Sequence, residues 1–120
     1  MADNKDYIVR PDEQGNINIS VEVVAAIAAG AALECDGVAS MYAIGKDISG
    51  FFGKKNSSKG VKATLEEDAL IIDVYLSVKL GTEIGKVGES VQAAVASAVE
   101  STTGLAVQTV NVHVVGVTLD

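Results

Sequence analysis

The two side chains most often used in catalysis or metal binding each occur once in this sequence. They are His113, the only histidine, and Cys35, the only cysteine. A single histidine cannot form a multi-histidine metal site, and its place in an alternating segment favours a structural or surface role. Cys35 lies between Glu34 and Asp36, whose charges would raise the pKa of its thiol, the opposite of what a nucleophile needs. Neither residue predicts a catalytic centre.

The acidic and glycine-rich stretches also lack the spacing of known sites. Residues 66–68 are three acids, but the ligand spacing of a calcium loop is absent, so a hairpin turn is the simplest interpretation. Asp73 alternates with other polar residues, which favours a solvated sheet face. The glycines of residues 45–53 lack the Gly-Lys-Ser/Thr ending of a phosphate loop. We therefore predict a protein that is not an enzyme, with no catalytic, cofactor-binding or metal-binding residues.

A basic loop at residues 45–60 is the best candidate for a binding site. Residues 46–62 contain five lysines and one acid, a net charge of +4, whereas the remainder of the chain carries −11. Two phenylalanines flanked by lysines could contact an anionic partner, either a lipid surface or a single-stranded nucleic acid. A mobile, solvated loop would have the same composition, and both interpretations stay open. The residues predicted to bind a partner are Lys46, Phe51, Phe52, Lys54, Lys55, Lys59 and Lys62.

Residues 69–80 form the strand around which the other elements are expected to pack. Even-numbered positions from Leu70 to Leu80 are all aliphatic, and the odd-numbered positions between them are mostly polar. Successive side chains of a strand point to opposite faces, so one face is buried and the other faces water. This is the habit of an antiparallel or mixed sheet.

The rest of the chain predicts an α+β fold. Ser20 and Thr82 are suitable N-caps for two helices, and Gly104 is a suitable end for the second. The order strand, helix, three strands, helix, strand predicts a mixed sheet with both helices packed on one face. The expected strands are residues 15–19, 38–44, 61–66, 69–80 and 106–119, and the expected helices are residues 21–34 and 83–103.

The first predicted helix is apolar nearly all round. Ala26, Ala29, Gly30 and Ala31 are small and would let another backbone approach closely. Packing against the sheet explains this composition, and so does a helix–helix contact with a second protein. Packing against the sheet is the favoured interpretation.

The length of 120 residues fits one domain. We predict a flexible N-terminal arm at residues 1–14, in which residues 7–9 can add a short strand, and one domain at residues 15–120. The polar N-terminus predicts no secretory signal, and the longest apolar run, residues 23–33, is about half of what a membrane span needs. We therefore expect a cytoplasmic protein without a membrane span of its own. Nucleic-acid binding over the whole acidic body is disfavoured.

Several short motifs together resemble a known family. The ordered set resembles the alkaline shock protein family of Gram-positive bacteria over about residues 15–119, and the short chain is similar to its housekeeping members. The motifs are Gly15, Ile17-x-Ile19-Ser20, Gly37-Val38, Gly60-Val61, Asp73, Gly81, Thr103-Gly104-Leu105 and Asn111-Val112-His113-Val114-x-Gly116-Val117.

The resemblance implies a non-enzymatic cytoplasmic protein-interaction module linked to cell-envelope stress and homeostasis. It also implies self-association and, for some members, a membrane-anchored partner that holds them at the membrane. Two alternatives stay open. The first, from the resemblance to members encoded near acetyl-CoA carboxylase genes, is a modulator of that enzyme and of fatty-acid synthesis. The second is a small RNA-binding domain, because the Gly-Phe-Phe-Gly sequence at 50–53 is superficially like the clamp of KH domains.

Overall fold

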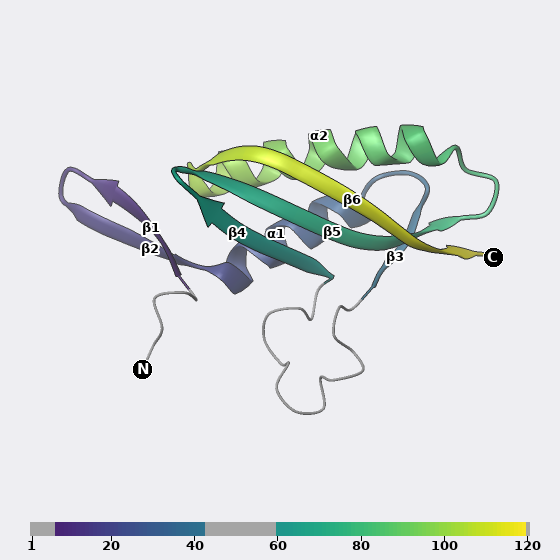
Figure 1. Cartoon of the computed structure of the whole chain (residues 1–120), viewed down its shortest axis with the longest axis horizontal. Helices are drawn as coiled ribbons and strands as arrows, with labels where there is room; N and C mark the ends of the chain where they lie inside the picture. The colour runs from purple at the N-terminus through teal and green to yellow at the C-terminus, as the bar shows by residue number, and fades with distance from the viewer. Residues whose placement is uncertain (1–6, 43–59, 120) are drawn as a thin grey trace, which may run out of the picture.

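The computed structural model describes residues 7–42 and 60–119. The α+β class is confirmed, with one strand more than the sequence predicted (Figure 1). In chain order the elements are β1 (Tyr7–Asp12), β2 (Gly15–Ser20), α1 (Val21–Leu33), β3 (Val38–Met41), β4 (Val61–Glu66), β5 (Ala69–Lys79), α2 (Ile84–Thr103) and β6 (Ala106–Thr118).

Strand β5 is the centre of a mixed sheet, as predicted. Strand β6 runs parallel to it along its whole length. On the other edge, β4 and β3 lie end to end and both run antiparallel to β5, with Val61 opposite Val74 and Met41 opposite Leu76. Because β3 and β4 share one side of β5, this four-stranded sheet is three strands wide, and β6 forms its other edge.

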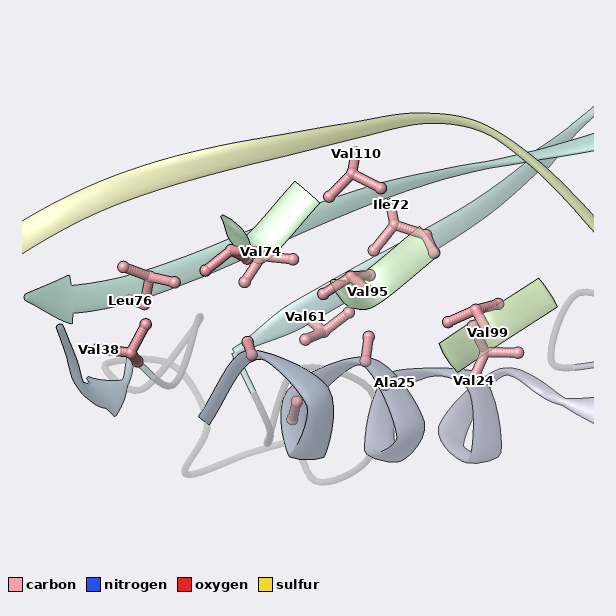
Figure 2. Close-up of a cluster of buried hydrophobic side chains, with 14 of the residues drawn as sticks. Val24, Ala25, Val38, Val61, Ile72, Val74, Leu76, Val95, Val99 and Val110 are labelled. Carbon is pink, nitrogen blue, oxygen red and sulfur yellow. The ribbon is translucent and has the colours of Figure 1, made fainter. Parts of the chain in front are cut away.

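Both helices cover one face of this sheet, which confirms the predicted layering. The even-numbered residues of β5 from 70 to 78 are at most 1% exposed, whereas the odd-numbered ones remain partly accessible. Figure 2 shows Val95 of α2 beside Ile72 of β5, and Val24 of α1 beside Val99 of α2. The strict alternation of β5 thus fixes which face of the sheet carries the core and which stays open.

Strands β1 and β2 form a separate antiparallel hairpin, with Tyr7 opposite Ser20 and Pro11 opposite Asn16. The expectation that residues 1–14 form a flexible arm is therefore wrong for Tyr7–Asp12, and the short strand considered at 7–9 is longer than expected. Pro11 is tolerated because β1 is an edge strand. Figure 1 shows the hairpin projecting beyond the sheet. Ile8, 3% exposed, joins it to the core.

The helix ends agree with the sequence in two of three cases. Ser20 caps α1, since its hydroxyl accepts a hydrogen bond from the Glu22 amide at 3.1 Å. Gly104 ends α2 in the left-handed conformation, with a φ of 78°. The prediction that Thr82 caps α2 is wrong, because the N-cap position falls on Glu83, which makes no side-chain cap bond. The Thr82 hydroxyl instead donates to the Lys79 carbonyl. In the described part of the chain, neither helix is long and apolar enough to cross a membrane.

Candidate functional site

A polar cluster occupies the open face of the sheet, opposite the helices. It arises from the register of three neighbouring strands. Asp73 on β5 lies between Lys62 on β4 and Asn111 on β6, and one step along the strands Tyr75 lies opposite His113. All five positions carry side chains on the face that α1 and α2 leave uncovered, because their neighbours along each strand point into the core.

The contacts within the cluster centre on one carboxylate oxygen. The Asn111 side-chain amide donates to Asp73 Oδ1 at 3.1 Å, and His113 Nε2 lies 3.1 Å from the same oxygen. The rings of Tyr75 and His113 are stacked, with centroids 4.4 Å apart and planes 14° from parallel. The stack orients the imidazole so that Nε2 reaches Asp73. The cluster is therefore a connected network and not a set of separately solvated side chains.

These contacts set the ionisation of Asp73. Partial burial by itself would raise the pKa of Asp73, but hydrogen bonds from His113 and Asn111 and the positive charges of His113 and Lys62 outweigh burial, so the pKa lies below its ordinary value. Asp73 is thus held as a carboxylate that accepts hydrogen bonds. A general acid or base acting near neutral pH needs the opposite shift.

The network predicts a pH-dependent contribution to stability. A carboxyl group whose pKa is lowered by folding stabilises the protein at pH values above its unfolded pKa of about 4, and this stabilisation is lost as the pH falls through the lowered folded pKa. We expect Asp73→Asn to lower the free energy of unfolding at pH 7 by about 1 kcal/mol, and the difference from wild type to shrink below pH 4. Urea unfolding from pH 7 to pH 2 measures it. A difference that is constant over this range would contradict the prediction.

Of the seven residues predicted to bind a partner around the basic loop, the structure describes only Lys62. Lys62 is exposed on β4 beside Asp73, so it belongs to the open face. The remaining predicted contacts, and the Gly-Phe-Phe-Gly sequence at 50–53, lie outside the described residues. The residues outside the described part are Lys46, Phe51, Phe52, Lys54, Lys55 and Lys59.

The other residues weighed for chemistry lie just after α1 and in the β4–β5 turn. Burial raises the pKa of the Cys35 thiol, and the charges of Asp36 and Glu34 raise it further. Its sulfur lies 3.6 Å from the Ala31 carbonyl oxygen, to which it donates. The acids at 66–68 make the β4–β5 turn, with Glu67 at a φ of 58°. Across residues 7–42 and 60–119, no three histidine, cysteine or acidic side chains are placed to share a metal ion.

Sequence reasoning missed the network because it depends on the pairing of strands far apart in the chain. Alternation alone places Asp73 and Tyr75 on one face of β5, and Asn111 and His113 on one face of β6. Only the parallel register brings these two pairs into contact. The sequence signal that could have found the network is the matching alternation of the two segments. Pairing β5 with β6, with both polar faces turned outward, would have placed these residues together.

The comparison with known families gives one match over almost the whole described chain. The sequence model of the alkaline shock protein family matches residues 9–119, and this family is described as having a cell envelope-related function. This range includes both helices, the sheet and most of the β1–β2 hairpin.

Individual proteins are also similar to the chain. The uncharacterized protein YqhY of Bacillus subtilis is 41% identical over 109 residues, which cover 88% of this chain and 79% of that protein. The uncharacterized protein YloU of Bacillus subtilis is 41% identical over 106 residues, covering 86% and 88%. Among solved structures, the MamM CTD resembles 82% of this chain and 85% of its own at 15% identity, with a TM-score of 0.47.

Proposed function

Because the chain belongs to the alkaline shock protein family, whose function is related to the cell envelope, we propose that it is a non-enzymatic protein-interaction module. In this role it binds another protein at the cell envelope and also associates with itself. The observation that carries the proposal is the family match over residues 9–119, which spans nearly the whole described fold and not one isolated motif.

The chemistry of the polar side chains supports a role without catalysis. The two most reactive candidates are tuned away from reactivity, since the pKa of the Cys35 thiol is raised and that of the Asp73 carboxyl is lowered. A nucleophilic thiol and a general acid near neutral pH require the reverse. The Asp73 network lies on an open sheet surface, which suits contact with a macromolecule.

Attachment through a partner explains how such a module would act at the envelope. We propose that the protein lies in the cytoplasm and is held at the membrane by a membrane-anchored protein. The test is affinity capture of the tagged full-length chain from its native cells, with membrane and soluble fractions analysed separately by mass spectrometry. We expect a membrane protein to be enriched in the membrane fraction. Capture of no partner in either fraction would contradict the proposal.

Self-association is supported by the open edge of β6. Near its start this edge is covered by α2, since Gln92 donates to the Val110 carbonyl at 3.1 Å and Glu100 accepts from the Val107 amide at 2.9 Å. Beyond Val110, no strand of the described residues pairs with the outer edge of β6. Unpaired strand edges are the usual site of strand addition between chains. Sedimentation of the full chain tests this, and a monomer at all concentrations would contradict self-association.

A further inference from the structure

The outward side of α1 carries an exposed apolar seam in heptad spacing. Its members are Val23, Ala26, Gly30 and Leu33, at intervals of three, four and three residues, and all four are exposed. This is the spacing of the a and d positions through which two helices pack. Val23 and Leu33, one near each end, are each 48% exposed.

The interior of the protein does not account for this seam. The positions of α1 that pack on the core are a different set, namely Val24, Ala25, Ala28, Ala29 and Ala32. Gly30 weakens the helix relative to alanine. A Cβ added at Gly30 would meet no atom within 4 Å, so nothing within the described fold requires glycine there. A glycine at the middle of an exposed seam does allow a second helix to approach closely.

The seam continues into a groove beside the N-terminus of α1. A cavity of about 440 Å³ lies between the β1–β2 hairpin, the start of α1 and the end of α2, and Val23 lines it together with Ile17 and Ile19. Arg10 also lines this groove, where it lies against Gly104 at the end of α2. An apolar surface thus extends from Leu33 past Val23 to the hairpin.

The charges next to the seam select its occupant. Glu22 precedes Val23, and Glu34 and Asp36 follow Leu33, while α1 itself contains no basic residue. The one basic residue that lines the adjoining groove, Arg10, lies at the Val23 end, away from Glu34 and Asp36. A second copy packed in the antiparallel direction would bring Glu22 against Glu34, and one packed in the parallel direction would bring each of these acids beside its own counterpart. A helix with lysine or arginine beside its apolar seam would instead find opposite charges, most strongly at the Leu33 end.

We propose that the outer face of α1 is the docking site for an amphipathic, basic helical segment of another protein. This inference rests on the proposed interaction function and names the surface and the chemistry of the partner. The segment would place an apolar seam on Val23, Ala26, Gly30 and Leu33, with its basic residues facing Glu34 and Asp36.

Two synthetic peptides of about 18 residues test the proposal. Both have leucine at a and d positions. One has lysine at e and g, and the other has glutamate there. Isothermal titration calorimetry of the full chain is expected to show at least tenfold tighter binding of the lysine peptide. Glu34→Gln together with Asp36→Asn should reduce that preference severalfold. Equal affinity for both peptides, or binding of neither, would overturn the proposal.

A matched pair of glycine variants locates the site. Gly30→Gln adds an uncharged side chain at the centre of the seam and should weaken lysine-peptide binding at least tenfold. Gly85→Gln makes the same change on α2, where an added Cβ also meets nothing within 4 Å, and should bind as wild type does. Circular dichroism checks that both variants are folded. Unchanged binding by Gly30→Gln would place the peptide elsewhere and refute the site.

Two further outcomes would assign the seam to a different occupant and refute the proposal. The first is a dimer in sedimentation that Gly30→Gln abolishes, which would identify a second copy. The second is Gly30-dependent binding to vesicles of anionic lipid in place of the lysine peptide. The affinity capture described above separates this inference from the proposed function. A partner captured equally by wild type and Gly30→Gln would leave the interaction function standing and remove only the α1 site.

Discussion

Replacing Gly60 with alanine is expected to lower the free energy of unfolding by about 3 kcal/mol. Gly60 is buried immediately before β4 and has a φ of +78°, and its carbonyl accepts a hydrogen bond from the Tyr75 amide at 2.8 Å. An alanine Cβ there would lie 2.6 Å from the Tyr42 carbonyl oxygen and 3.0 Å from that of Tyr75. Backbone atoms on two neighbouring segments would have to move, so the join between β3, β4 and β5 would loosen.

Gly30→Ala is the matched control for this change, because it makes the same substitution without the constraint. Gly30 lies within α1 at negative φ, and its added Cβ meets nothing within 4 Å. Alanine is the better helix former, so the free energy of unfolding of this variant should rise by about 1 kcal/mol. Urea unfolding of both variants at pH 7 measures the two effects. A loss of less than about 1 kcal/mol for Gly60→Ala would show that the sheet accommodates the extra carbon.

How far the sequence could predict the fold depends on whether its signals are local. The alternation of β5, the cap at Ser20 and the glycine at 104 are local, and each predicted its element to within a residue or two. The β1–β2 hairpin was underestimated because β1 is short, contains Pro11 and buries only Ile8 deeply. Thr82 failed as a cap because α2 begins one residue later than predicted, so the N-cap position falls on Glu83.

The candidate sites depend on information that one strand or helix does not carry. The Asp73 network needs the register between β5 and β6, which pairs Asp73 with Asn111 and Tyr75 with His113. To find the α1 seam, its exposed positions must be distinguished from the core positions of the same helix. Nearly every position of α1 is apolar, so its sequence alone cannot show which side faces the sheet. In the fold, the buried and exposed sets separate cleanly onto two sides.

Because β5 has one buried and one open face, a substitution at Ile72 on its buried face is expected to have a large effect on stability. This side chain is fully buried between the sheet and the helices, where Figure 2 shows it beside Val95 and Val110. We expect Ile72→Ala to lower the free energy of unfolding by about 4 kcal/mol, because it removes buried carbon atoms and leaves a cavity that the helices cannot fill. For a domain whose total stability is typically about 5–15 kcal/mol, this is a substantial fraction.

The control is the next residue along the strand. Ile71 points to the open face between Thr64 and Thr109, where it is only partly buried. Ile71→Ala should therefore lower the free energy of unfolding by only about 1 kcal/mol, although the chemical change is identical. Urea unfolding at pH 7 compares the two variants directly. Similar losses for Ile71→Ala and Ile72→Ala would mean that the open face is covered in solution, for instance by a second copy of the chain, and a concentration dependence of the Ile71→Ala loss would then identify that copy.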